Sequence, residues 1–298
     1  MIDLHQAIGL GVAGNFTGHL EQAGEASDFT HVAAAEGAPK GVFPFYVPPA
    51  CAVDAQHFLH TFPLSTDTIE HPGRIAGRPA HLQIEPELAL LCTLGYADDA
   101  ARSVASITPT HFAAYNDCST RRPDATKISQ KKNWGPNTKG LAADPWIELD
   151  TFAPGSVLDR FRLACYLLRD GRLHAYGEDS PVAGPEGYGY MYAQLTDWLI
   201  DRLNTQTDHG PLEHLADWLR IAGHPSHAVV SIGATRYTEL GEKIFLQPGD
   251  ESIVVAYDAT RHDARTLEAS LLHGESVDGA GVTCSVLRQR VVGHSSVN

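Results

Sequence analysis

Two glutamates stand two residues apart in an apolar stretch of the chain, IEPELALL at residues 84–91. In a β-strand, residues i and i+2 point to the same face and lie roughly 6.5 Å apart along the chain, so Glu85 and Glu87 share a face. If that face is the interior, the carboxylates repel each other and lose water together unless a cation lies between them. The alternative is an edge strand with its acids in solvent. Pro86 favours an edge or a strand start, because it cannot donate to a ladder.

The strongest secondary-structure signals lie in the second half of the chain. Residues 161–168 and 172–177 flank Asp170-Gly171, a dipeptide typical of a tight hairpin turn. Apolar residues recur at helical spacing in 191–203 and 211–223, and the second run has Pro at its start and Gly at its end. Further strands are predicted at residues 7–13 and 227–233, and on both sides of a Pro-Gly-Asp turn within 243–258. Strands that dominate, with two helices inserted late, predict an α+β fold.

Charge and composition restrict the partners of this chain. The 298 residues carry 22 Lys and Arg against 36 Asp and Glu, a formal net charge of -14, which argues against a nucleic-acid partner. A basic loop at 127–140 stands out against this acidic background. No run approaches the ~20 apolar residues that span a bilayer, so no membrane partner is expected. The odd number of cysteines without CxxC spacing predicts reduced thiols and a cytoplasmic location; they are Cys51, Cys92, Cys118, Cys165 and Cys284.

Polar motifs follow one another in a definite order along the chain. They are Gly14-Asn15-Phe16 with His19, Glu85-x-Glu87, Asp117 with Arg121, Lys139-Gly140, Gly233-Ala234-Thr235 and Leu246-Gln-Pro-Gly-Asp250. Over roughly residues 8–258, this order resembles that of the fumarylacetoacetate hydrolase superfamily. Each motif is common by itself, so the resemblance depends on six matches in the right order.

The resemblance implies a metal site. By position, Glu85, Glu87 and Asp117 would bind one divalent cation. Three carboxylates suit a hard ion, with Mg²⁺ the first choice and Mn²⁺ or Ca²⁺ as alternatives. In that superfamily the ion acts as a Lewis acid on a small anionic substrate, typically a 2-oxo or β-dicarbonyl carboxylic acid, and stabilises the enolate that forms.

The resemblance also assigns roles to the residues around the ion. Arg121, Lys139 and Thr235 match residues that would bind the substrate's anionic groups. Lys139, His19 and Glu21 are the predicted catalytic residues. Together they imply an enzyme that cleaves a C–C bond, a hydrolase or lyase acting on substrates like acylpyruvates or fumarylacetoacetate.

The segment after His19 departs from the hydrolytic pattern. Active hydrolases of this type often carry Glu three residues after the histidine, whereas here Gln22 takes that place and the acid is Glu21. On a helix, i+2 does not face i, so Glu21 orients His19 only if the segment is not helical. Glu25 is a second candidate. The change favours, as the alternative function, a hydratase, decarboxylase or isomerase, in which no activated water is needed.

Other departures indicate a divergent branch of the superfamily. The usual FLKP segment reads Phe45-Tyr46-Val47-Pro48 and loses its lysine, and Arg122 stands where an acid is usual. Ser119 replaces the usual threonine but keeps a hydroxyl, and the hydroxyl of Thr235 has moved by one position. These changes leave the predicted fold and metal site in place and leave the substrate open.

The implied architecture is a mixed β-roll or β-sandwich with flanking helices. It divides into an N-terminal part at 1–80 with a lid-like His segment, a catalytic β-roll at 81–258 and a C-terminal extension at 259–298, or forms one continuous domain. Members commonly pair, so a homodimer is expected. Two other readings stay open: a non-catalytic protein that binds organic acids, and an unrelated β-rich protein, which a large distance between Glu85 and Asp117 would favour.

Overall fold

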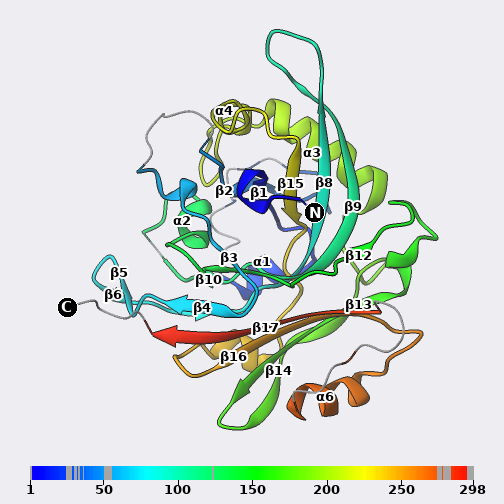
Figure 1. The fold of residues 1–298 in the computed structure, drawn as a ribbon. Helices are drawn as coiled ribbons and strands as arrows, with labels where there is room; N and C mark the ends of the chain where they lie inside the picture. Colours follow the sequence, from blue (N-terminus) through cyan, green and yellow to red (C-terminus); the bar gives the residue numbers. More distant parts are fainter. Residues whose placement is uncertain are drawn as a thin grey trace.

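Two mixed β-sheets share one main apolar core (Figure 1). The computed structural model describes residues 2–24, 29, 32, 34–35, 37–49, 56–122, 124–273, 277 and 283–293. The first sheet consists of β1 (Ile8–Ala13), β2 (Gly41–Tyr46), β3 (Leu64–Ser65), β8 (Pro86–Tyr96), β9 (Val104–Asn116), β11 (Lys139–Leu141), β12 (Ile147–Glu148) and β15 (His227–Ser231). Its order is β2-β1-β15-β8-β9-β11-β3, and β12 also pairs with β9.

The second sheet has the order β14-β13-β16-β17-β4. Its strands are β4 (Thr68–His71), β13 (Phe161–Arg169), β14 (Arg172–Pro181), β16 (Glu251–Asp258) and β17 (Cys284–Gly293). Two short ribbons pair β5 (Arg74–Ile75) with β6 (Arg78–Pro79), and β7 (Leu82–Gln83) with β10 (Ser119–Thr120). The helices are α1 (His19–Gln22), α2 (Ser129–Lys132), α3 (Tyr192–Thr205), α4 (Leu215–Ile221), α5 (Glu239–Lys243) and α6 (Ala264–His273), with 3₁₀ turns η1 (Leu4–Gln6), η3 (Phe58–His60) and η4 (Val157–Arg160).

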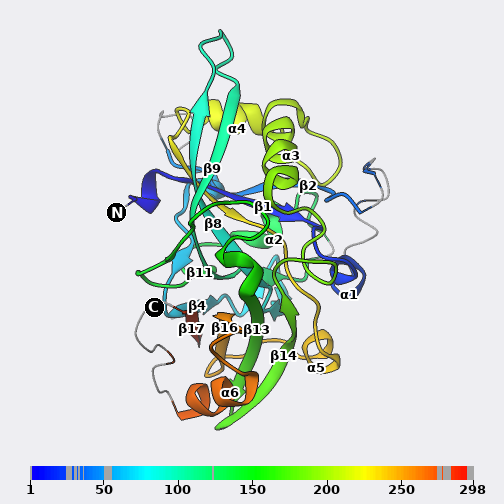
Figure 2. The ribbon, with the colours of Figure 1, turned by 90° about the vertical axis from the view of Figure 1, so that its right-hand side faces the viewer.

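Helices α3, α4 and α6 pack against these sheets. Helix α3 packs on β9 and β2, and α4 on β2, whereas α6 lies under the second sheet (Figure 2). Alternation along β16 separates the two faces: Val254 enters the main core, and Ile253 and Val255 pack towards α6. Parallel pairs, β1 with β15 and β17 with β4, occur among antiparallel ones. The predicted α+β class and mixed β-roll with flanking helices are confirmed.

Several elements predicted from the sequence are confirmed. Strands β13 and β14 form a hairpin whose turn residues Asp170 and Gly171 both have positive φ, 51° and 72°, as a tight two-residue turn requires. Helix α3 covers the predicted run. The predicted helix at 211–223 is shorter: α4 begins at Leu215, because the His214 side chain accepts a hydrogen bond from the Asp217 amide and caps the helix there.

The prediction of two strands within 243–258 is half wrong. Only β16 forms; the residues before the turn continue from α5 without a ladder. Single hydrogen bonds hold them instead, from the Tyr176 hydroxyl to the Ile244 carbonyl and from the Leu246 amide to the Leu82 carbonyl.

Pro86 opens β8, so the predicted strand start is confirmed, but the edge-strand alternative is wrong. Strand β8 lies inside the first sheet, between β15 and β9. The four cysteines in the described ranges are buried and free, and Cys51 lies outside those ranges. Among the described helices, none combines the length and apolar character that crossing a bilayer requires.

Gly9 lets an aromatic ring of β2 lie directly on β1. A Cβ atom at this position would lie 2.2 Å from the Phe45 ring, which is fully buried. Gly9→Ala should therefore destabilise the fold by about 1–3 kcal/mol through overpacking. Adding Phe45→Leu removes the clashing atoms, so the double variant should lose less stability in urea unfolding than the two single losses together. Additive losses would contradict this explanation.

Candidate metal centre

Three acids separated in sequence meet where β8 begins and β9 ends. Glu85 immediately precedes β8, Glu87 is its second residue, and Asp117 immediately follows β9. The Asp117 amide donates to the Glu85 carbonyl at 2.9 Å. The three side chains are buried, and one oxygen of each lies within 4.8 Å of the others. The large separation of Glu85 and Asp117 that would favour an unrelated β-rich protein is therefore not found.

Side-chain cations surround two of these acids. Lys132, at the end of α2, places its Nζ 2.5 Å from Glu85 Oε2 and 2.6 Å from Asp117 Oδ2. The Lys139 Nζ lies 3.2 Å from Asp117 Oδ1, and Arg121 Nη1 lies 3.2 Å from Glu85 Oε1. Every carboxylate oxygen of Glu85 and Asp117 thus faces an ammonium or a guanidinium group.

The pKa shifts distinguish the acids. Burial raises the pKa of Glu85, but the Lys132 ammonium and the Arg121 guanidinium outweigh burial and hold this pKa well below its ordinary value. Burial and then the Asp117 charge raise the pKa of Glu87 well above its ordinary value, although Glu87 Oε2 accepts the Gly233 amide at 2.9 Å. Ionised Glu87 therefore has less compensation than its two neighbours.

His19 presents one ring nitrogen to this cluster. Its Nδ1 lies 2.9 Å from the Thr235 carbonyl oxygen. Because a carbonyl can only accept, Nδ1 carries the hydrogen in this contact. In a neutral ring, Nε2 is then the acceptor, and it lies 3.9 Å from Glu85 Oε2. The orienting group on His19 is thus a backbone carbonyl.

The acid predicted to orient His19 is not brought to the cluster. Glu21 lies two residues along the same short helix, α1, and its side chain is exposed, whereas His19 is buried. This is the geometry expected of i and i+2 on a helix. Glu25, the second candidate, lies outside the described residues.

The remaining predicted site residues lie along the wall of the cluster. Arg121 donates through Nε to Gln83 Oε1 and through Nη2 to the Tyr237 hydroxyl at 3.0 Å. The Thr235 amide donates to the Pro86 carbonyl at 3.1 Å, and its hydroxyl is buried with no hydrogen-bond partner in the described part of the chain. Lys139 is fully buried, and burial lowers its pKa. Its ammonium donates a hydrogen bond to the Cys118 carbonyl. Lys139 therefore lies deeper in the protein than a surface site for an anion would require.

The sequence predicted no role in the site for three of its residues, Lys132, Gln83 and Tyr237. The basic loop was visible there, but nothing in its composition distinguishes Lys132 from the neighbouring Lys131. Gln83 and Tyr237 belong to no motif of the resembled superfamily. Their role follows only from the tertiary contacts that hold Arg121 against Glu85.

The donor types fit a hard divalent cation. Three carboxylates supply oxygen ligands only, the set that Mg²⁺, Mn²⁺ or Ca²⁺ prefers. Neither Asp117 oxygen has a hydrogen-bond partner among the described residues, despite the ion pairs to the two lysines. Glu85, Glu87 and Asp117 are therefore the residues that could hold an ion.

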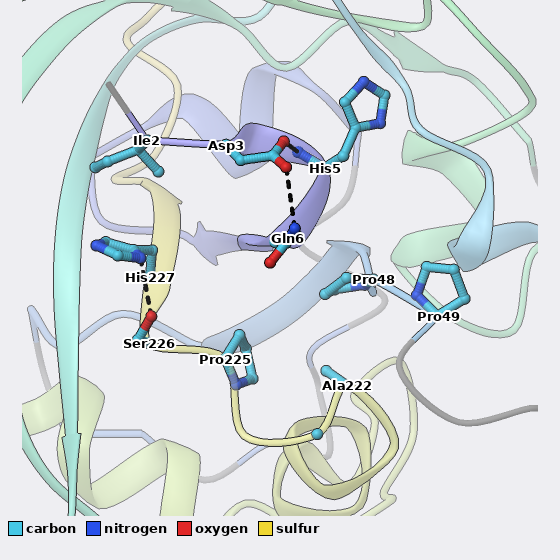
Figure 3. A pocket seen from close by; sticks show the side chains of 11 residues that line it. Ile2, Asp3, His5, Gln6, Pro48, Pro49, Ala222, Pro225, Ser226 and His227 are labelled. Carbon is cyan, nitrogen blue, oxygen red and sulfur yellow. Dashed lines mark hydrogen bonds between the residues drawn. The ribbon is translucent and has the colours of Figure 1, made fainter.

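A large open cavity lies elsewhere (Figure 3). It has a volume of about 890 Å³ and is lined by residues of the N-terminal segment, Pro48, Pro49 and the segment leading into β15. Its polar groups bond to one another: the Asp3 carboxylate accepts from the His5 amide and the Gln6 side chain, and Ser226 contacts His227. The cavity lies at the start of β15, whereas the acids meet residues that follow the end of this strand.

A further buried carboxyl, that of Glu213, holds the helix that carries Lys132. The Ser129 hydroxyl, in the first turn of α2, donates to Glu213 Oε1. Nearby, the Lys127 ammonium donates to the Leu212 carbonyl at 2.7 Å. Burial raises the pKa of Glu213 to about 7, despite the hydrogen bond from Ser129.

This shift predicts a pH-dependent loss of stability. Because the pKa of Glu213 is higher in the folded state than its ordinary value of 4.5, ionisation favours unfolding as pH rises from about 4.5 to about 7, by about 3 kcal/mol when complete. Glu213→Gln keeps an acceptor for Ser129 and should flatten this dependence in denaturant unfolding between pH 4.5 and 8. The exposed control Glu239→Gln should retain the wild-type slope. An unchanged slope in Glu213→Gln would rule out Glu213 as its source.

Comparison with protein families gives one match. Residues 25–291 match the profile of DUF5718, a family of unknown function. No curated protein sequence matches the chain.

Solved structures resemble the chain over nearly its whole length. A crystal structure of Cg1458 with inhibitor has 16% sequence identity and a TM-score of 0.53, covering 97% of this chain and 77% of that chain. 5-Carboxymethyl-2-hydroxymuconate delta-isomerase from Mycobacterium smegmatis has 15% identity, a TM-score of 0.49 and coverages of 97% and 80%. A protein from Yersinia pestis CO92 assigned to the fumarylacetoacetate hydrolase family has 10% identity, a TM-score of 0.46 and coverages of 96% and 93%. At 16% identity, the likeness to the Cg1458 structure is a likeness of fold.

Proposed function

Because the chain belongs to DUF5718, a family of unknown function, and has a fumarylacetoacetate hydrolase-like fold, we propose that it is a divalent-metal-dependent enzyme acting on a small 2-oxo or β-dicarbonyl carboxylic acid. One observation carries this proposal. Three buried acids, three side-chain cations and a ring nitrogen of His19 meet in one cluster. Buried charges of both signs beside a histidine are typical of functional sites.

Glu85, Glu87 and Asp117 would hold the ion, with Mg²⁺ the first choice. When bound, the ion would supply Lewis-acid stabilisation of negative charge on the substrate. Arg121 would bind a substrate carboxylate; its contacts with Gln83 and Tyr237 fix the direction of the guanidinium group.

Two further residues act beside the ion. We assign Lys139 to the Asp117 side of the site, where its buried ammonium offsets the charge of that acid. Thr235 orients His19 through its carbonyl and keeps a buried hydroxyl for the substrate.

His19 would accept a proton from the substrate at Nε2. The Thr235 carbonyl fixes the tautomer but adds no full negative charge, so it stabilises the imidazolium less than a carboxylate would. A histidine oriented by a carbonyl is therefore better suited to proton transfer next to a carbonyl group of the substrate, as in an isomerase, hydratase or decarboxylase, than to the activation of water. A C–C bond hydrolase or lyase is the second candidate, because Glu85 Oε2 lies 3.9 Å from Nε2 and offers a carboxylate beside the ring.

Removal of the metal should abolish turnover. The purified protein, treated with EDTA, is screened against acylpyruvates, oxaloacetate and fumarylacetoacetate-like acids with and without Mg²⁺ or Mn²⁺. Activity should return with the ion, and Glu87→Gln should lower kcat/KM on the order of 100-fold. Glu239→Gln, an exposed Glu-to-Gln change, should have no effect. Turnover that survives both EDTA and Glu87→Gln would refute the metal-dependent function.

Loss of the His19 ring should slow proton transfer without abolishing metal binding. His19→Gln should lower kcat by about 10²–10⁴-fold, the usual contribution of a general base, while the Kd for Mg²⁺ stays near that of the wild type. Exchange of the substrate's C3 proton in D₂O, followed by NMR, reports this step directly. Undiminished exchange in His19→Gln would assign the base to another group.

The homodimer and the cytoplasmic location stay predictions of the resemblance and of the cysteine pattern. Sedimentation of the purified protein tests the first.

A further inference from the structure

We propose that Lys132 is a tethered cation that competes with the divalent ion for Glu85 and Asp117, and so sets the metal affinity of the site. This inference rests on the proposed function, because it concerns the same acids. It concerns a residue that lies outside the motifs of the resembled superfamily, and it states when the site can bind metal.

The position of the Lys132 ammonium carries the argument. It bridges one oxygen of Glu85 and one of Asp117 at 2.5 and 2.6 Å. Oxygen ligands hold divalent ions at about 2.0–2.6 Å, close to the distances at which Glu85 and Asp117 hold the ammonium. The ammonium therefore occupies space that an ion held by both acids would need, and one cation would have to leave before the other could bind.

The other oxygens of the two acids offer the ion no easier position. Glu85 Oε1 faces Arg121, and Asp117 Oδ1 faces Lys139, each at 3.2 Å. An ion that bound there would still lie next to the Lys132 ammonium and be repelled by it. Metal binding therefore includes the work of separating Lys132 from at least one acid.

The surroundings stabilise Lys132 where it lies. Its side chain is 4% exposed, and its ammonium lies 5.5 Å from the centre of the Phe43 ring, within the range of a cation–π contact. The Ser129–Glu213 hydrogen bond anchors the other end of its short helix. Lys132 thus approaches the acids from a fixed element, so its insertion needs little ordering of a flexible chain.

The test compares metal binding, not turnover, in two proteins. Lys132→Met keeps the apolar stem and removes the ammonium. By isothermal titration, its Kd for Mn²⁺ should be on the order of 10- to 100-fold lower than that of the wild type, the range of a typical coupling between two ligands. Lys243→Met, an exposed lysine on α5, controls for the change in net charge and should bind as the wild type does.

Thermal unfolding gives a second readout. Without metal, Lys132→Met leaves two buried acids short of a counter-ion and should have a lower Tm than the wild type. Saturating Mn²⁺ should raise the Tm of Lys132→Met more than that of the wild type. If Lys132→Met folds only when Mn²⁺ is present during refolding, the proposal is supported in the same way. If Lys132→Met does not fold with or without Mn²⁺, the measurement on the wild-type protein decides.

The wild type provides that independent measurement. In NMR spectra of lysine-labelled protein, assigned with Lys132→Arg, the Lys132 Cε signals should shift when Mg²⁺ saturates the site, because the ammonium leaves its partners. Signals that do not move on saturation with Mg²⁺ would overturn the proposal.

The outcomes separate this inference from the proposed function. Equal Kd values for wild type and Lys132→Met overturn the competition and leave a metal-dependent enzyme standing. Binding by Lys132→Met alone supports the competition and contradicts metal dependence in the wild type. If neither protein binds Mn²⁺ or Mg²⁺, both proposals fail.

Discussion

The contact of Lys132 with Glu85 and Asp117 determines how this protein can bury two of the three clustered acids. An isolated carboxylate loses several kcal/mol of hydration on burial, which only an opposite charge or a proton offsets. Two of the acids meet cations at every oxygen. The third, Glu87, depends on a backbone amide. The charges in the site are therefore unevenly matched, and the imbalance lies at Glu87, on the strand where the apolar run begins.

The sheet places these charges by backbone register. Pro86 pairs with Asn116 across β8 and β9, so the residues that flank the pair, Glu85 and Asp117, leave the ladder together. The amide of Asp117 then bonds to the carbonyl of Glu85. A one-residue slip would turn Glu87 to the opposite face of the sheet. Residues 86–92 of β8 are buried on both faces, and Leu88 and Leu90, on the face opposite Glu87, belong to the main core.

The acids could be predicted from the sequence because their geometry is local or repeats a known order of motifs. Glu85 and Glu87 share a face through the period of a strand, and Asp117 follows in the expected place. The tight turn at Asp170-Gly171 could also be predicted, because a turn with positive φ at both positions favours Asp followed by Gly. These features need no knowledge of distant contacts.

Lys132 could not be predicted, because its position depends on a helix of one turn that distant contacts fix. Four residues form no stable helix alone, and α2 is held by Glu213, far along the chain. Orientation of His19 escaped prediction for a similar reason: its partner is the backbone of Thr235, which carries no side-chain signature. The strand predicted before the Pro-Gly-Asp turn failed because β-propensity does not reveal whether a neighbouring strand is there to pair.

The balance of charge links metal and substrate within the proposed function. The cluster holds three acids, two lysines and one arginine, so the formal charges cancel before any ion binds. A divalent ion alone would leave the site with surplus positive charge, which burial penalises. A small organic acid brings the opposite charge, and more of it develops as an enolate forms. Ion and anionic substrate should therefore each favour the binding of the other, and Lys132, displaced by the ion, would remain close enough to contribute to the charge that holds the substrate.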